Sequence, residues 1–390
     1  MLDRVTALIG AGPKKVRDEI TQNRLQTSLL LHQYPLVAST LFEICGDIDH
    51  IYPYLTSGDL SKVRLPSKLK KTLKDKAWLG EQDHLTTMEN WLAQPDHALI
   101  WLGSEGYPAQ LTEIADPPLL LYAVGDLALL KQPQLAIVGS RNPTQYGRRV
   151  TKLFAEEIGK SGIVVTSGMA RGIDSAAHRS VLDVGGRTIA VLGTGCDQVY
   201  PPENKSLMAE IAASGLLLSE FPPGTGPAPS HFPQRNRIVT GMSYGTLVVE
   251  ARVRSGSLIS ARLAMEQGRG VFAVPGSVLS KQSEGCHYLL KEGAQLASSV
   301  ADIIEELSIS HPDLRFHPEA DPPPARSNLG QHQQRVLNAI DLEPRSVDRI
   351  AKQTGMPTTE ILQTLVELEL AGIVTSVGGN YQLYEDWKRE

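Results

Sequence analysis

The chain has 390 residues, of which 41% are hydrophobic and 21% charged, with 34 glycines and 25 prolines. This length allows about two to four folded domains, and the composition excludes a disordered or fibrous protein. The formal net charge of −5, taken alone, argues against a nucleic-acid partner.

Cysteine usage and hydropathy give the first expectations about location. Cys45, Cys196 and Cys286 lie far apart with no C-x-x-C pair, so neither a disulfide framework nor a thiolate zinc site is predicted. No apolar stretch approaches the ~20 residues that cross a bilayer, and residues 1–12 lack a secretory signal pattern. We expect a cytoplasmic protein with no membrane span, metal or cofactor.

Residues 1–105 contain short apolar segments with polar interruptions and no clean strand alternation, which predicts a small helical domain. Within it, Ser61–Lys76 holds seven basic residues and one acid. Such a run is either a solvated helix face or an auxiliary phosphate-contacting helix.

Residues 106–307 alternate short apolar runs with helical patterns, which predicts an α/β domain with a doubly wound parallel sheet. The predicted strands are Leu135–Gly139, Ile163–Ser167, Thr188–Leu192, Leu216–Ser219, Thr246–Glu250 and Val271–Val274. The predicted helices between them include Arg148–Ile158, Ser175–Leu182, Lys205–Ala213 and Leu258–Glu266.

Residues 308–330 are rich in proline and poor in aliphatic residues, which is typical of a linker. Residues 331–390 then show three helical patterns, Gln334–Ile340, Val347–Thr354 and Thr358–Leu370, followed by two short strands around Gly378. Three helices and a hairpin predict a winged helix-turn-helix.

Charge is unevenly distributed, and residues 139–262 hold 14 Lys and Arg against 9 Asp and Glu. Two predicted strands in this region end in glycine-rich turns that contain an arginine, beginning at Gly139-Ser140-Arg141 and at Gly168 followed by Arg171. Carboxyl ends of parallel strands share one sheet edge, where ligands bind, so an anionic ligand is expected there. Plain turn glycines with a helix cap at Asp174 are the alternative.

Further basic residues follow in the same region. Lys205 opens a predicted helix, and Arg235 and Arg237 stand near Phe232. Cations beside an aromatic ring suit single-stranded nucleic acid, since phosphates interact with the charges and a base stacks on the ring. Phe232 is alternatively a core residue.

These segments resemble the DNA-processing protein A family, known as DprA or Smf. The resemblance is carried by AIVGSRNPTQYG, VTSGMARGIDSAAH, IAVLGTGCDQVYPPEN, LLLSEFPPG, FPQRNRIVTGMS, VVEARVRSGSLISARLA and VFAVPG, in the family's order. It implies an extended Rossmann-like domain that binds single-stranded DNA, an N-terminal helical domain of the sterile-alpha-motif (SAM-like) type and an optional winged helix.

The resemblance also implies a role and a set of residues. The family's role is to protect incoming single-stranded DNA, to form a homodimer through the Rossmann-like domain and to help load the RecA recombinase in natural transformation. None of the matched residues would be catalytic. Those that would bind DNA are Gly139, Ser140, Arg141, Gly168, Arg171, Lys205, Phe232, Arg235, Asn236 and Arg237.

The alternative function is enzymatic, a nucleotide phosphoribohydrolase resembling the "lonely guy" family. That family carries P-G-G-x-G-T-x-x-E with an active-site glutamate. Here the nearest stretch, Met242–Glu250, lacks the diglycine and places Glu250 one residue too far along. On a strand, one residue turns the side chain to the other face.

The predicted winged helix departs from a DNA-binding pattern. Residues 331–390 hold 6 Lys and Arg against 9 Asp and Glu, and Thr358–Leu370, in the recognition-helix position, contains no basic residue. A helix that enters a DNA groove normally presents Arg, Lys, Asn or Gln. A protein-contact or regulatory role is therefore favoured for this domain.

Overall fold

The structure is a computed structural model that describes Thr27, Ile51 and residues 82–311, 330–340, 344–370, 373–377 and 380–383. The chain divides into two compact units, Met1–His317 and Pro318–Glu390. Most of the helical domain predicted for residues 1–105, including the basic stretch Ser61–Lys76, lies outside the described residues.

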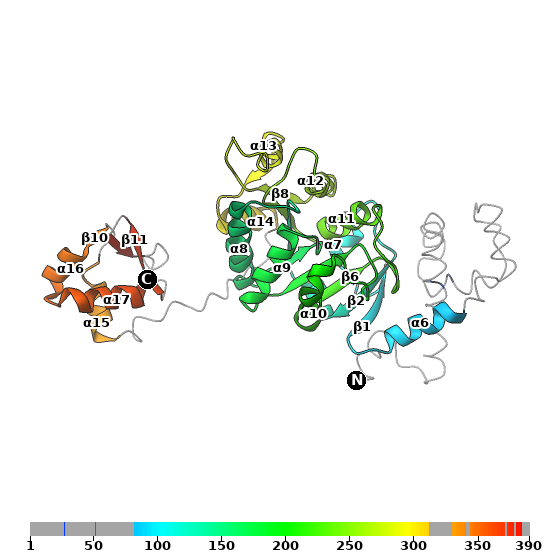
Figure 1. The fold of residues 1–390 in the computed structure, drawn as a ribbon, viewed down its shortest axis with the longest axis horizontal. Coiled ribbons are helices and arrows are strands. Elements are labelled where there is room, and N and C mark those ends of the chain that lie inside the picture. Colours follow the sequence, from blue (N-terminus) through cyan, green and yellow to red (C-terminus); the bar gives the residue numbers. More distant parts are fainter. Residues whose placement is uncertain are drawn as a thin grey trace. The chain divides into compact units, whose positions relative to one another are not determined.

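Residues 82–311 form a sheet of nine strands in the order β1-β2-β6-β5-β4-β3-β7-β8-β9 (Figure 1). The strands are β1 His97–Trp101, β2 Leu120–Gly125, β3 Gln134–Val138, β4 Val164–Ser167, β5 Thr188–Leu192, β6 Leu216–Ser219, β7 Gly245–Val248, β8 Gly270–Ala273 and β9 Gln295–Leu296. Strands β3, β4, β5, β6, β7, β8 and β9 pair in parallel with their neighbours in this group. The bounds of the six predicted strands are confirmed to within two residues.

Helices cover both faces of the sheet, as expected for a doubly wound fold. They are α6 Gln82–Leu92, α7 Ala109–Thr112, η2 Leu127–Lys131, α8 Gln145–Lys160, α9 Ile173–Asp183, η3 Pro202–Asn204, α10 Lys205–Ser214, α11 His231–Gly241, α12 Gly256–Glu266, α13 Glu284–Lys291 and α14 Val300–Ser310. In β3, Leu135 and Ile137 pack with α8, α9 and α14, while Ala136 and Val138 pack with α11, α12 and α13 on the opposite face. The alternating strand residues thus supply two cores.

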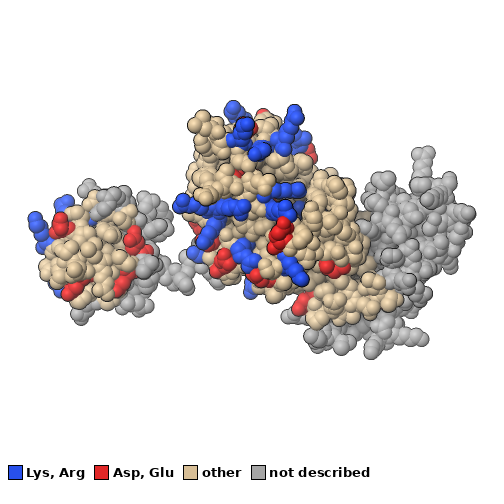
Figure 2. All heavy atoms as spheres, viewed as in Figure 1, with Lys and Arg blue, Asp and Glu red and all other residues tan. Residues whose placement is uncertain are grey.

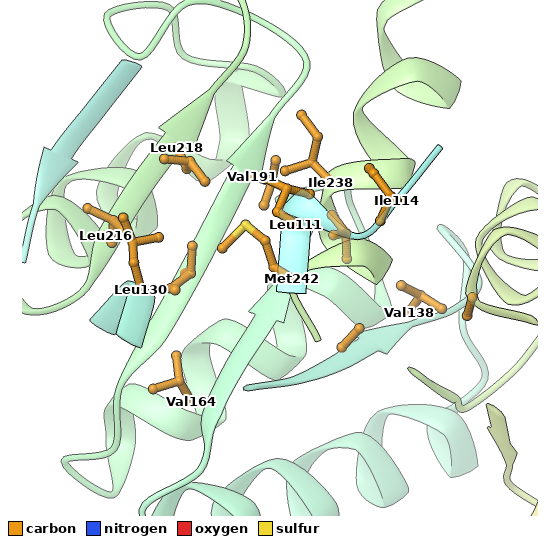
Figure 3. Close-up of a cluster of buried hydrophobic side chains, with 14 of the residues drawn as sticks. Leu111, Ile114, Leu130, Val138, Val164, Val191, Leu216, Leu218, Ile238 and Met242 are labelled. Carbon is orange, nitrogen blue, oxygen red and sulfur yellow. The ribbon is translucent and has the colours of Figure 1, made fainter. Parts of the chain in front are cut away.

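The core under α11 joins segments that lie far apart in sequence (Figure 3). Leu111 and Ile114, from the region of α7, pack with Ile238 of α11, with Met242 directly after α11 and with Val191 of β5. All five side chains are buried, so this core holds α11 rigidly against the carboxyl half of β5.

Two strands of the sheet were not predicted: β1 precedes the predicted start of the α/β domain at residue 106, and β2 lies within that domain. Strands β1 and β2 pair antiparallel with each other, and β2 also pairs antiparallel with β6. The sheet therefore begins at His97, inside the region predicted to be helical. The sequence did not reveal this strand because Ala98–Trp101 is buried throughout and shows no alternation of apolar and polar residues. At the other end, α14 continues to Ser310, beyond the predicted boundary at residue 307.

The order of connections defines a switch point at β3. The chain moves outward from β3 through β4, β5 and β6, then returns to place β7 on the other side of β3. The loops after β3 and β7 consequently diverge at the carboxyl edge of the sheet, which is where open α/β sheets bind ligands. We call this carboxyl edge, with the loops that follow β3, β4, β5, β6, β7 and β8 and the first turns of the helices after them, the rim.

The second unit is a small winged helix, as predicted. Helices α15 (Gln331–Leu337), α16 (Val347–Thr354) and α17 (Thr358–Leu370) pack with a sheet of order β10-β12-β11. The strands are β10 Arg345–Ser346, β11 Val374–Val377 and β12 Asn380–Leu383. This unit has its own buried core, which includes Ile350, Leu365 and Val374. None of the helices in the described parts of the chain is both long and apolar enough to span a membrane.

Candidate nucleic-acid interface

The loops after β3 and β4 contact each other through their backbones. The Ile173 amide donates to the Ser140 carbonyl at 3.1 Å, and a Cβ added to Gly172 would lie 2.3 Å from the same carbonyl oxygen. Gly172 also has a φ of +86°, a conformation that favours glycine. The two predicted anion-binding turns therefore form one structural element.

Two of the predicted site residues shape these turns. A Cβ on Gly139 would approach the Ile173 side chain to 2.6 Å, so this glycine permits packing of the first residue of α9. The Ser140 hydroxyl accepts a hydrogen bond from the Asn142 amide at 3.1 Å. Both residues fix the direction in which Arg141 leaves the turn.

Arg141 and Phe232, both predicted to contact DNA, lie close together, and a second ring joins them. The Arg141 side chain is exposed, and its guanidinium carbon lies 5.7 Å from the centroid of the Phe232 ring. Phe232 is half-buried against Gly193, and its centroid is 5.4 Å from that of Tyr200, which is 42% exposed. One side of the Phe232 ring thus packs against Gly193, while part of the ring remains exposed to solvent.

Tyr200 is the functional candidate that the sequence prediction omitted. It precedes Pro201 in the segment that leads to Lys205, and its distance from Phe232 along the chain gave no sign of their contact. The only signal was an aromatic residue in a loop that follows a predicted strand. An exposed ring at such a position is suited to stack on a base.

Arg171 and Lys205 lie on two connected segments. Asn204 donates to the Met169 carbonyl at 2.8 Å and to the Ser175 hydroxyl at 2.9 Å, which fastens the start of α10 to the β4 loop. Arg171 is exposed and paired with the exposed Glu203. Lys205 is exposed and forms no ion pair with any residue that the structure describes.

Arg235 was predicted to contact DNA, but the structure places it inside the protein. Its side chain is 3% exposed, and Nη1 donates to the Val191 carbonyl at 2.8 Å. A Cβ added to Gly168 would lie 1.7 Å from that Nη1. Burial lowers the pKa of Arg235 to about 10, and the nearby Asp174 carboxylate opposes this effect. Arg235 therefore supports the β4 and β5 loops from beneath.

Arg237 is also engaged within the protein. Nη2 donates to a Glu220 carboxylate oxygen at 2.7 Å, and Nε donates to Asp116 at 3.2 Å. Although burial acts to lower the pKa of Arg237, Glu220 and Asp116 outweigh it and the pKa is raised. Arg235 and Arg237 have different partners because side chains two positions apart on a helix point in different directions. Asn236, between them, is half-buried.

Glu250 has a structural partner that bears on the enzymatic alternative. It is 2% exposed and accepts hydrogen bonds from the Thr144 amide, at 2.9 Å, and from the Thr144 hydroxyl. A Cβ on Gly147 would lie 2.4 Å from the same carboxylate. Glu250 is therefore buried beneath the N-terminus of α8, where a carboxylate complements the helix dipole.

The larger unit carries many exposed cations. Figure 2 shows Lys and Arg side chains gathered on one face of this unit, over the region of α8, α9 and α12. Those at the rim that form no ion pair with described residues include Arg141, Arg148, Arg149, Lys205, Arg252, Arg254 and Lys281. Among the described residues, no group of three His, Cys, Asp or Glu side chains is arranged to hold a metal ion.

Fold and site together define the class: a Rossmann-like α/β protein with a cationic, partly aromatic carboxyl edge and a separate winged helix. The family model described as DNA recombination-mediator protein A matches residues 98–308, and the DprA winged helix domain matches residues 320–380. The chain belongs to the DNA recombination-mediator protein A family, as the sequence motifs predicted.

Relatives and solved structures agree with this assignment. The chain is 44% identical to protein Smf of Escherichia coli over 75% of this chain and 78% of that protein, and 48% identical to DNA processing protein DprA of Streptococcus pneumoniae over 51% and 71%. The solved structure of the Streptococcus pneumoniae protein is similar with a TM-score of 0.61, 37% identity and coverage of 74% and 95%. DNA processing protein A of Helicobacter pylori, whose structure concerns its single-stranded DNA binding mode, has a TM-score of 0.50, 34% identity and coverage of 55% and 96%.

Proposed function

We propose that this protein binds single-stranded DNA at the rim and acts as a recombination mediator without catalysing a reaction. The observation that carries the proposal is the cluster of Arg141, Phe232 and Tyr200, with Lys205 exposed on the same sheet edge. Neither cation forms an ion pair with a residue that the structure describes. The cations attract phosphates, and the rings accept bases of any sequence. Family membership and the single-stranded DNA binding of the Helicobacter pylori relative support the same function.

The finer role that we propose is protection of incoming single strands and delivery of them to the RecA recombinase during natural transformation, in the cytoplasm. We also propose a homodimer through the Rossmann-like domain. Strand β9 supports this, because it is the last strand of the sheet, both its residues are exposed, and Leu296 is 51% exposed. An unprotected edge with apolar side chains invites pairing with a second copy.

A mobility-shift salt series with oligothymidylate tests the DNA site. We expect Arg141→Ala and Lys205→Ala each to weaken binding to all sequences and to reduce the slope of log K against log salt by about 0.7, as for one lost phosphate contact. Lys160→Ala is the matched control, because Lys160 is exposed at the opposite end of α8. Unchanged slopes in both rim variants would refute the site.

The same assay and two others separate the finer roles. A preference of the wild type for duplex over single strands would move the DNA contact to the winged helix. Sedimentation of Leu296→Glu tests the dimer, since a charge at the apolar edge should shift the protein toward monomer. RecA filament formation on single strands, followed through its ATPase activity with and without this protein, tests delivery.

A further inference from the structure

The other half of the rim carries a feature that the proposed site does not use. The loop after β7 presents Arg252, Val253 and Arg254, and the loop after β8 presents Val278 and Leu279, followed by Lys281. We call these six residues the β7–β8 tip. They lie on the side of β3 away from β4, β5 and Lys205.

The apolar side chains of the tip face water. Val278 is 83% exposed, Leu279 is 92% exposed and Val253 is 54% exposed, and the first two exceed every other large exposed hydrophobic residue in the described part of the chain. Aliphatic groups gain free energy when they leave water. Two adjacent ones at a loop end therefore indicate a surface that is covered by a partner.

Hydrogen bonds hold the loop that presents them. The Ser280 amide donates to the Ser277 carbonyl at 3.0 Å, and the Ser283 amide donates to the Ser280 carbonyl at 3.0 Å. A Cβ on Gly276 would lie 2.2 Å from the Ser283 hydroxyl, so the two ends of the loop are closely packed. Val278 and Leu279 are consequently displayed on a preformed turn.

The tip is joined directly to the proposed DNA site. The Gln282 side chain donates to the Asn142 carbonyl at 3.0 Å, one residue beyond Arg141, and the Gln282 carbonyl accepts from the Ala251 amide at 2.8 Å. The loops after β3, β7 and β8 thus form a continuous surface.

The charge of this region selects the partner. Residues 251–283 contain five Lys and Arg and one acidic residue, Glu266. Arg252, Arg254 and Lys281 are exposed and form no ion pair with described residues. Unpaired cations that alternate with exposed aliphatic groups match a chain that carries phosphates on one side and apolar base faces on the other.

We propose that the β7–β8 tip is a second contact site for single-stranded nucleic acid, in which Arg252, Arg254 and Lys281 bind phosphates while Val278 and Leu279 pack against bases. This rests on the proposed function and extends its track along the rim. Aliphatic side chains are known to contact or separate stacked bases when basic residues hold the backbone beside them. The tip thereby sets the length of strand that one protomer occupies.

Affinity as a function of strand length tests the proposal. We compare oligothymidylates of about 6 and about 20 nucleotides, which span the site sizes of single-strand binders. V278S/L279S should weaken binding of the long strand about tenfold with an unchanged salt slope, because no charge is removed. R252A/R254A should reduce the salt slope on the long strand by about 1.4. Both should bind the short strand as the wild type does.

Ile309→Ser is the matched control, since Ile309 is 68% exposed at the end of α14, remote from the rim. Wild-type affinity of both tip variants for every strand length would overturn the proposal, and so would normal DNA binding combined with altered sedimentation or impaired RecA delivery. Arg141→Ala and Lys205→Ala, measured in the same series, separate the two conclusions. Loss in those variants alone leaves the proposed function standing without the second site.

Discussion

The side chain of Arg235 explains why one glycine after β4 is required. Its guanidinium fills the space beside the Gly168 backbone and bonds to the end of β5, so it braces two loops of the rim at once. Asp174 supplies the opposite charge, and burial raises the pKa of that carboxyl while Arg235 limits the rise. A buried charge with a partner of this kind is costly to disturb.

Gly168→Ala tests this arrangement. The added methyl must displace Nη1 of Arg235, which lies 1.7 Å from the Cβ position, and thereby break its bond to the Val191 carbonyl. We expect a loss of about 1–3 kcal/mol in the free energy of unfolding, together with weaker single-strand binding. Gly226→Ala is the control, since a Cβ there meets nothing within 4 Å. Equal behaviour of the two variants would contradict the bracing role.

His178 makes the stability of the larger unit sensitive to acid. Its Nδ1 lies 2.7 Å from the Thr188 hydroxyl, which itself donates to the Val165 carbonyl, so Nδ1 carries the proton. Burial, assisted by Arg235, lowers the pKa of His178 to about 3. Between that pH and about 6.5 the unfolded chain binds a proton that the folded chain does not, so stability rises with pH across this window.

The expected size of the effect is about 2 kcal/mol of unfolding free energy lost between pH 7 and pH 5. Urea unfolding of the full chain at the two pH values, followed by circular dichroism, measures it. His178→Gln should remove most of this pH dependence, whereas His332→Gln, at an exposed histidine of the winged helix, should retain it. A wild-type midpoint that does not fall toward pH 5 would exclude this account of His178.

Among the elements, α8 depends on a carboxylate from another part of the sequence. Thr144 caps the helix by accepting from the Gly147 amide at 3.1 Å, and Glu250 in turn binds Thr144. The residue that the enzymatic alternative would place in catalysis is thereby used to fix the start of a helix.

Glu250→Ala should destabilise the fold by about 1.5–3 kcal/mol, the range for hydrogen bonds to a charged group whose partners remain buried. Thermal unfolding measures the change, with the exposed Glu266→Ala as the comparison. Incubation of the wild type with nucleoside monophosphates should release no base. Base release that disappears in Glu250→Ala would instead support the phosphoribohydrolase.

The elements show what the sequence could and could not predict. Strands β5 and β6 were predicted with their observed bounds, because fully buried parallel strands appear as continuous apolar runs between turn residues. Strands β1 and β2 were not predicted. They form an antiparallel extension that shows no alternation of apolar and polar residues, and they come before the first repeated strand–helix units in the sequence. Strand β9 has two residues, too few for any pattern.

Some residues of the candidate site lie where the sequence analysis expected them, and others do not. Residue type and position after a strand placed Arg141, Arg171 and Lys205 on the rim, and the structure shows all three exposed. The same reasoning put Arg235 and Arg237 there, but charge does not tell which side of a helix faces the core. Their burial depends on Asp174, Glu220 and Asp116, whose proximity follows only from the tertiary fold.

At the scale of the whole molecule, we expect the winged helix to contact a protein rather than DNA. Leu362 and Val366 are four residues apart on α17 and are 41% and 50% exposed, with Glu360, Glu367 and Glu369 on the same helix. Exposed apolar groups on a helix that carries three acids and no Lys or Arg suit a basic protein surface better than a polyanion.

Truncation after residue 330 should therefore leave the affinity for single strands within about threefold of the full chain, which is under 1 kcal/mol. The larger unit retains its own cores and the entire rim in this variant. Mobility shifts on single-stranded and duplex oligonucleotides provide the measurement. A drop of more than about tenfold would show that the winged helix supplies DNA contacts.

The pair formed by Arg171 and Glu203 has a consequence for turnover. Both side chains are about 60% exposed, and such surface pairs contribute only about 0–1 kcal/mol. A DNA phosphate can replace the Glu203 carboxylate at Arg171 at little cost in free energy. When the phosphate leaves, Glu203 can pair with Arg171 again. We therefore expect this carboxylate to shorten slightly the lifetime of a phosphate bound at Arg171.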